Sequence, residues 1–264
     1  MAELGRARPI VVAAIGVLLT ANISVLSFDR ADAERRIAQR VARTTTSMKP
    51  APSGRLLFGK SDTLLGPPTM FTVDARGRQL TPSSRQPERT DQIVGPFRVF
   101  RNAAGIAMAW SDGSHEHQLA RGLVGEPSVG RDGVVAFARR HGEADDIVLL
   151  TLSNRRERVL TSGTYRSLAW SHDGTRIAAT GKDLWILRVE NGKAAQLTRN
   201  STESRPTQPV WSPDDSHIAF VWRGNIVVMG GDGSDVAIAH HPPTAAGRTE
   251  YVSLFGWERD NMAA

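Results

Sequence analysis

From Gly54 onward, the chain alternates short apolar runs with clusters of Gly, Asp, Asn and Ser. The runs are rich in Val, Ile, Leu, Phe and Trp, and each is long enough for a strand but short for a helix. Several runs are separated by Asp-Gly or Asn-Gly pairs, which favour tight hairpin turns because glycine adopts positive φ without steric cost. The pattern therefore predicts a series of antiparallel hairpins and an all-β fold.

The hairpin pattern repeats along the chain. "AWSHDGTRIAATGKDLWILRVENGKAAQLT" is followed by "VWSPDDSHIAFVWRGNIVVMGGDGSDVAIA", which places Trp170 and Trp211 41 residues apart. Val129 lies 41 residues before Trp170, and Trp257 lies 46 residues after Trp211. Each copy predicts up to four antiparallel strands, and a sheet of that size is too small to be stable alone. Regular recurrence at this spacing predicts a repeat architecture in which neighbouring sheets bury one another.

The two ends of the repeat region are complementary. The first copy, Gly54–Thr81, lacks an opening strand, whereas "TEYVSLFGW" near the C-terminus is an opening strand without the later strands of a copy after it. Pairing these two segments closes a ring and removes an exposed sheet edge. This predicts a five-bladed β-propeller. Its blades comprise residues 250–257 with 54–81, then 91–120, 126–161, 167–198 and 207–239. An incomplete six-bladed ring is the alternative, but it leaves only about 35 residues for each blade.

The repeat residues resemble a known family. "AWSHDGTRIA" and "VWSPDDSHIAF", followed by "LWILRV" or "IVVM", are similar to the WD-like propeller repeat of the TolB family. Thr81, Thr161 and Thr198 each close a strand of the form "(Q/V)LT", as in that family. The resemblance covers about 200 residues and implies the fold. The chain lacks the family's separate N-terminal α/β domain and has fewer blades, so a role in the Tol system is not implied.

The N-terminal region differs in character. Pro9–Phe28 is a 20-residue stretch without a charged side chain, long enough for a helix that crosses a bilayer. Arg6 and Arg8 precede it, so the N-terminus is expected in the cytoplasm and the rest outside. We expect an uncleaved signal anchor over residues 1–28, with signal-peptide cleavage near Ala31–Ala33 as the alternative. Residues 29–53 are expected to form a helical stalk and a Pro/Thr/Ser linker, and residues 54–264 the propeller.

Composition narrows the functional classes. The chain has no cysteine, which excludes disulfides, thiol catalysis and cysteine metal sites. The net charge of +6 is concentrated in residues 1–53, which carry +4, so the remaining residues carry only +2. A nucleic-acid-binding domain is expected to carry a concentrated basic face. We therefore expect no nucleic-acid partner.

The aromatic and acidic positions of the repeat have two possible roles. Trp170 and Trp211 could form stacking platforms for a ligand, but their shared place in the repeat favours packing between blades. Asp173 and Asp214 could be calcium ligands or acids. An aspartate at such a turn more simply accepts hydrogen bonds from nearby backbone N–H groups through its side chain. "GGDGSD", Gly230–Asp235, lacks the alternating oxygen ligands of a calcium loop and predicts a hairpin turn.

The histidines and the remaining acids are weaker candidates. His115 and His117 would share one face of a strand, and His240-His241 lies beside a proline-rich loop, but neither pair has an identifiable third metal ligand. Glu143, Asp145 and Asp146 have the pattern of an exposed turn. The sequence contains no Gly-x-Ser-x-Gly, His-Glu-x-x-His or phosphate-loop motif. We therefore assign no catalytic, cofactor or metal residue and expect no cofactor.

Together these features predict a membrane-anchored, extracytoplasmic propeller that acts as a non-enzymatic interaction or scaffold module. The expected partner is a protein of the cell envelope, and a small-molecule ligand is not expected. The long segments Thr81–Gln92 and His240–Glu250 are candidate partner surfaces. A carbohydrate-active propeller, either a lectin or a glycosidase, is the alternative function, and it would need acids and exposed aromatic residues along the central channel.

Overall fold

The computed structural model describes residues 52, 54–62, 66–84, 92–122, 124–199, 205–241 and 251–258. The chain divides into two compact units, Met1–Thr46 and Ser47–Ala264, and all described residues belong to the second. The predicted membrane anchor and helical stalk lie outside the described residues. Within them, no helix has the length and apolar character required to span a membrane.

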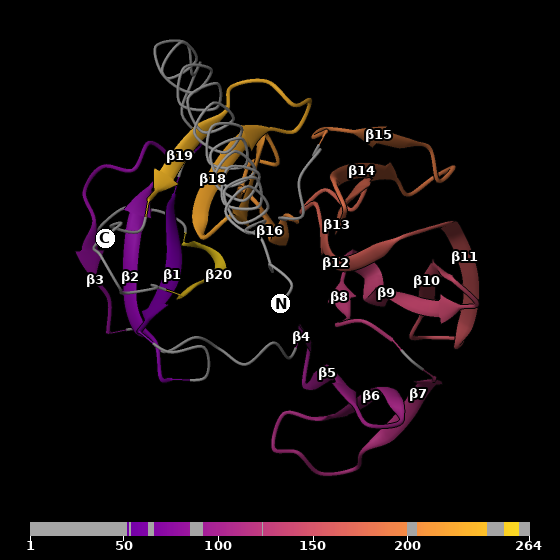
Figure 1. The fold of residues 1–264 in the computed structure, drawn as a ribbon. Helices are drawn as coiled ribbons and strands as arrows, with labels where there is room; N and C mark the ends of the chain where they lie inside the picture. Colours follow the sequence, from indigo (N-terminus) through magenta and orange to yellow (C-terminus); the bar gives the residue numbers. More distant parts are fainter. Residues whose placement is uncertain are drawn as a thin grey trace, which may run out of the picture. The chain divides into compact units, whose positions relative to one another are not determined.

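The described residues form five four-stranded antiparallel sheets, which we number as blades in chain order. Figure 1 shows the five sheets arranged around a common centre. Blade 1 contains β20 (Tyr251–Glu258), β1 (Arg55–Ser61), β2 (Thr69–Asp74) and β3 (Thr81–Pro82), from the centre outward. Blade 2 contains β4 (Gln92–Val94), β5 (Phe97–Asn102), β6 (Gly105–Trp110) and β7 (His117–Arg121). The predicted five-bladed propeller is therefore confirmed, and the six-bladed alternative is not observed.

The three remaining blades follow the same order. Blade 3 contains β8 (Ser128–Val129), the short 3-10 helix η1 (Arg131–Gly133), β9 (Val134–His141), β10 (Ala144–Thr151) and β11 (Arg156–Gly163). Blade 4 contains β12 (Tyr165–Trp170), β13 (Arg176–Gly181), β14 (Leu184–Arg188) and β15 (Ala194–Gln196). Blade 5 contains β16 (Thr207–Trp211), β17 (His217–Trp222), β18 (Asn225–Gly230) and β19 (Ala237–His240).

The two ends of the propeller close on each other, as the sequence predicts. β20 pairs antiparallel with β1, in a register that places Leu56 opposite Trp257 and Ser61 opposite Tyr251. A bulge between Leu57 and Phe58 shifts the register. Blade 1 is therefore a composite of both chain ends, which gives β1 a partner on both of its edges.

The strand β9 is buried on both faces, because its alternating side chains pack against two neighbouring blades. On β9, Val135 and Phe137 contribute to a core cluster shared with blade 2, whereas Ala136 and Ala138 contribute to a cluster shared with blade 4. Successive side chains on a strand point to opposite faces, so a strand covered on both sides reads as a continuous apolar run. This explains why "VVAFA" lacks the polar alternation of a half-exposed strand.

The core consists of clusters between neighbouring blades. Such clusters join blade 2 with blade 3, blade 3 with blade 4, blade 4 with blade 5, and blade 5 with blade 1. Among the described residues, no core cluster joins blade 1 with blade 2. Among the described residues, apolar clusters therefore hold four junctions of the ring.

Candidate functional site

The central channel is lined by residues of all five inner strands. A cavity of about 890 Å³ lies there; most of its lining residues have small or apolar side chains, but the surface that they expose in it is more polar than apolar. They include Ile93 of β4, Leu168 of β12, Val210 of β16 and Gly256 of β20. Asp173 is the only carboxylate among the described residues that line it. A glycosidase needs two carboxyl groups that flank the scissile bond, and the described part of the channel wall supplies no such pair.

The repeated tryptophans pack between blades, which confirms the structural interpretation. Trp211 is 3% exposed, and its Nε1 donates to the backbone oxygen of Ala169 in blade 4 at 3.0 Å. In the same way, Trp170 Nε1 donates to the backbone oxygen of Ser128 in blade 3 at 2.9 Å. Each indole therefore fills an interblade gap and satisfies its N–H there, as buried tryptophans do.

The repeated aspartates close the turns that follow these tryptophans. Asp173 Oδ1 accepts hydrogen bonds from Ser171 Oγ at 2.6 Å, Thr175 N at 2.9 Å and Thr175 Oγ1 at 2.8 Å. Asp214 accepts the corresponding bonds in blade 5 from Ser212 and Ser216. Burial is the largest single influence on both carboxyl groups and opposes ionisation. The hydrogen bonds together outweigh it and lower the pKa of each. These residues act as predicted, in the turns.

The histidine pairs are not assembled into a common site. His115 lies in a turn with φ +55° and β7 begins at His117, so the two do not share a strand. His240 is buried against the ring of Phe58, with centroids 4.8 Å apart, whereas His241 is exposed and its Nδ1 lies 2.5 Å from Asn225 Oδ1. Within the part of the chain that the structure describes, no group of three metal-ligating side chains forms.

The interpretation of Glu143, Asp145 and Asp146 as one exposed turn is wrong for two of the three residues. Glu143 lies in the hairpin turn, but Asp145 and Asp146 lie on β10. Asp145 is 6% exposed and its carboxylate lies 2.9 Å from Nε of Arg140 on the paired strand. Pairing across the hairpin allows the charged Asp145 to be buried, which a turn pattern in the sequence does not reveal.

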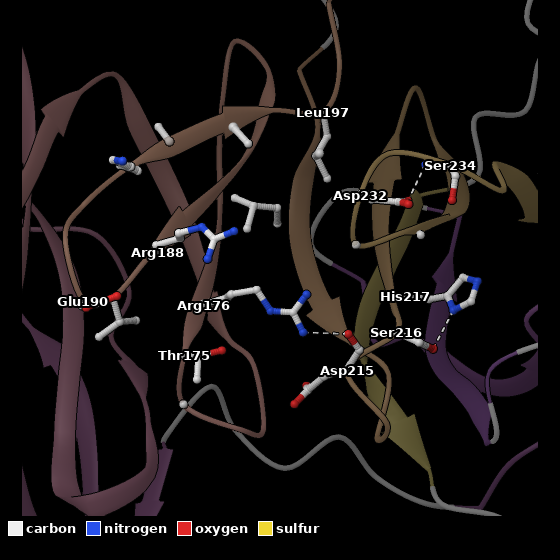
Figure 2. A pocket seen from close by; sticks show the side chains of 18 of the residues that line it. Thr175, Arg176, Arg188, Glu190, Leu197, Asp215, Ser216, His217, Asp232 and Ser234 are labelled. Atoms are coloured by element: carbon white, nitrogen blue, oxygen red, sulfur yellow. Dashed lines mark hydrogen bonds between the residues drawn. The ribbon is translucent and has the colours of Figure 1, made fainter.

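A large concave site lies between blades 4 and 5. It has a volume of about 1180 Å³ and is bounded by the hairpin turns at one end of both blades. We call it the 4–5 groove. Its charged and histidine lining residues are Arg176, Arg188, Glu190 and Lys193 from blade 4, and Asp215, His217, Asp232 and Asp235 from blade 5. Figure 2 shows the labelled side chains of the two blades on opposite sides of the groove.

The blade 4 wall carries two opposed arginines. Arg176 on β13 pairs directly with Arg188 on β14. Val189 N donates to Thr175 O at 3.0 Å, which makes the arginine pair a non-hydrogen-bonded pair, the position where opposing side chains lie closest. Figure 2 shows both guanidinium groups extending from the blade 4 strands toward the groove. Like charges in this position repel each other.

Only one of the two arginines is held by neighbours. Arg176 Nη2 donates to the backbone oxygen of Asp215 at 2.9 Å, and the guanidinium carbon lies 4.5 Å from the centroid of the Trp211 ring. Arg188 and Lys193 are exposed, and within the described residues no hydrogen bond or ion pair engages either side chain. The blade 4 wall therefore presents one anchored cation, two cations without a partner among the described residues, and the carboxyl group of Glu190.

The blade 5 wall is acidic and contains a buried histidine. Asp232 Oδ1 accepts the Ser234 N–H at 2.9 Å, and hydrogen bonds from Ser234 lower the pKa of the Asp232 carboxyl group. His217 is 4% exposed, and its Nδ1 lies 2.7 Å from Ser216 Oγ. Its Nε2 is buried without a hydrogen-bond partner in the described structure. Burial lowers the pKa of His217, and the nearby carboxylates of Asp214, Asp235 and Asp232 oppose that shift.

Sequence reasoning missed the 4–5 groove. Its cations lie at the ends of strands and in turns, and they form no contiguous motif. The signal that could have located the arginines is the hairpin "ATGKDLW", because folding it at Gly181–Asp183 brings Arg176 opposite Arg188. The contribution of blade 5 depends on packing between two sheets, for which the sequence contains no comparable local signal.

Comparison with known proteins adds little beyond the fold. No family model matches the chain, and no curated protein matches it. Among solved structures it is similar to a putative TolB from Agrobacterium tumefaciens, at 16% identity over 72% of this chain and 79% of that chain, with a TM-score of 0.49. TolB from Acinetobacter baumannii is 16% identical over 77% of this chain and 67% of that chain, with a TM-score of 0.35.

An enzyme is also among the similar structures. An oligogalacturonate lyase in complex with manganese is 15% identical over 58% of this chain and 50% of that chain, with a TM-score of 0.42. At such identities and TM-scores the similarities assign no activity to this chain, and the propeller assignment rests on its own strand pairing.

Proposed function

We propose that this chain is a membrane-anchored, extracytoplasmic propeller that binds a protein of the cell envelope and catalyses no reaction. The observation that carries the proposal is the 4–5 groove, about 1180 Å³ in volume and lined by charged side chains from two blades. Sites for small molecules are mostly apolar concavities with a few polar groups. A large, open and charged groove between rigid sheets is better suited to a polypeptide segment.

The central channel supports the non-catalytic part of the proposal. Asp173, the carboxylate among the described residues of its wall, already accepts three hydrogen bonds within its own turn. A residue committed in this way is poorly placed to act as a general acid or base. This observation favours binding over glycoside hydrolysis.

The absence of cysteine from the sequence allows a direct test of partner binding. Single cysteines are introduced at Ser234 in the groove and at Arg121 on β7 of blade 2, and each is coupled to a thiol-reactive photo-crosslinker in cells of the native host. We expect Ser234→Cys to give a discrete adduct with one envelope protein and Arg121→Cys to give none. Equal adducts at both positions, or none at Ser234, would overturn the proposed binding role.

The same variants test the proposed topology. A maleimide that does not cross membranes should label Ser234→Cys in intact cells but should not label Ala2→Cys, which precedes the apolar stretch. Retention of the full-length chain in the membrane fraction is expected for an anchor. A shortened product released from the membrane would indicate signal-peptide cleavage, and protection of Ser234→Cys would contradict the extracytoplasmic location.

A further inference from the structure

Arg176 and Arg188 on blade 4 repel each other, and the described residues compensate the charge of only one of them. Arg176 and Arg188 face each other at the closest position of the β13–β14 ladder. Like charges directly opposite one another destabilise a sheet. Arg176 is compensated by the Asp215 backbone oxygen, the Trp211 ring and the Asp173 carboxylate at 3.8 Å, whereas Arg188 has no such partner in the described structure. An anion placed between the two guanidinium groups would remove the repulsion and gain charge-assisted hydrogen bonds.

The opposite wall restricts which anions fit. Asp232 and Asp235 line the blade 5 side of the same groove, as does Asp215, whose two carboxylate oxygens already accept backbone N–H groups of the blade 4 turn. The hydrogen bonds to Asp232 lower its pKa and so favour its charged form. A polyphosphate, a nucleic acid or an anionic membrane surface would meet this acidic wall with unfavourable charge. A polypeptide segment with acidic side chains on one side and basic side chains on the other meets both walls favourably.

We infer that the 4–5 groove binds a mixed-charge polypeptide segment, with acidic side chains against Arg176, Arg188 and Lys193 and basic side chains against the carboxylates of blade 5. This inference rests on the proposed protein-binding function and specifies the chemistry of the partner. Arg176, which is anchored, provides a fixed guanidinium. Arg188 and Lys193 are exposed and can adjust to the segment. The blade 4 wall carries three basic residues and one acidic residue, Glu190, so it is mainly cationic, whereas the blade 5 wall is acidic; this difference sets the orientation in which the segment lies.

The test uses the full-length chain and fluorescently labelled peptides of equal length, made of alternating Glu and Lys, of Glu only, or of Lys only. Binding is measured by fluorescence anisotropy. We expect the alternating peptide to bind tightest and its affinity to fall as salt is raised. Arg188→Glu should weaken that binding about tenfold, the size of one lost charge-assisted contact, and should shift the preference toward the Lys peptide. Asp232→Asn should shift the preference toward the Glu peptide.

The matched control is Arg121→Glu, which reverses an exposed arginine on β7, far from the groove in the blade order. It should leave the order of affinities unchanged. Every variant should unfold in one cooperative transition, and Arg188→Glu should not unfold more easily than the wild type, because it removes the repulsion with Arg176. Inorganic phosphate and phosphatidylglycerol vesicles serve as competitors and should displace the alternating peptide only weakly. The inference is overturned if the peptides bind equally or not at all, if Arg121→Glu acts like Arg188→Glu, or if vesicles bind in an Arg188-dependent manner.

These outcomes are separable from a failure of the proposed function. If Ser234→Cys still crosslinks one envelope protein in cells while the peptide preferences do not depend on Arg188, the groove binds a protein but does not select it by this charge pattern. If the crosslink is also absent, both the binding role and the charge pattern are contradicted.

Discussion

Asp215 of blade 5 binds the turn of blade 4 that contains His172. Asp215 Oδ1 accepts the backbone N–H of His172 at 2.7 Å and lies 3.0 Å from its Nδ1. The second oxygen accepts the backbone N–H of Asp173 at 2.7 Å. Asp215 occupies the repeat position of Gly174, and both have positive φ, +57° and +74° respectively. A side chain at this position allows one turn to cap its neighbour, so the 4–5 junction is held by polar contacts as well as by its apolar cluster.

Replacing this carboxylate should weaken the junction between the two blades. Asp215→Asn retains a side chain that tolerates positive φ but loses one of the two acceptors, because its amide nitrogen cannot accept a backbone N–H. We expect the free energy of unfolding to fall by about 1–3 kcal/mol, measured by urea denaturation. The control is Asp132→Asn, since Asp132 also has positive φ (+60°) but is exposed. Its effect should be smaller, and a similar loss in both variants would contradict the interblade role.

Closure of the ring by β20 predicts that the C-terminal strand is essential for stability. Leu254 of β20 is 5% exposed within the cluster that joins blades 5 and 1, and Leu254→Ala should lower the free energy of unfolding by about 2–5 kcal/mol. Tyr251→Ala, on the same strand but 37% exposed, should have a smaller effect. Deletion of residues 250–264 should be more severe than either. A truncated chain that melts like the full-length chain would refute the composite blade.

The buried His217 predicts a decrease in stability in mild acid. Burial lowers its pKa below the ordinary value of 6.5, so the unfolded chain binds a proton at a higher pH than the folded chain does. The free energy of unfolding should therefore fall as pH drops below 6.5, until the folded-state pKa is passed. Urea denaturation across this range should show the slope, and His217→Asn should reduce it.

The aspartates of the turns act in a different pH range. Asp173, Asp214 and Asp232 have a pKa lowered from 3.8, so their contribution to stability is complete above that value and is lost only as pH falls further. An unchanged slope between pH 6.5 and 3.8 in His217→Asn would show that His217 does not cause the decrease in mild acid.

The junction between blades 1 and 2 should open more readily than the others. No core cluster of described residues spans it, and blade 2 leaves Ile93 61% and Trp110 43% exposed. Regions with few buried apolar contacts open at low free-energy cost. Hydrogen exchange followed by mass spectrometry should show faster exchange in β4–β6 than in β16–β18. Equal protection in the two blades would show that polar contacts close this junction as firmly as the apolar clusters close the rest.

Much of the architecture could be predicted because the relevant signals are local and repeated. Asp-Gly and Asn-Gly turns locate the hairpins, and the spacing of Trp170 and Trp211 gives the length of a blade. The missing strand before Gly54 and the surplus strand before Trp257 predict the closure. The predicted location in the envelope and the membrane anchor depend on Pro9–Phe28, which lies outside the described residues, and they remain predictions.

The amino-acid sequence by itself determined the five blades, their order and the pairing of the two ends, because hairpin turns and alternating strands are encoded within a few residues of one another. Only the tertiary structure decided that Arg188 has an acidic wall across from it, that Asp215 caps the neighbouring turn and that Asp145 is buried. Each of these depends on how separate strands or sheets pack. The contacts of Arg188 and Asp215 involve residues of different blades, and the burial of Asp145 depends on how its hairpin packs in the sheet, so no local pattern in the sequence reveals them.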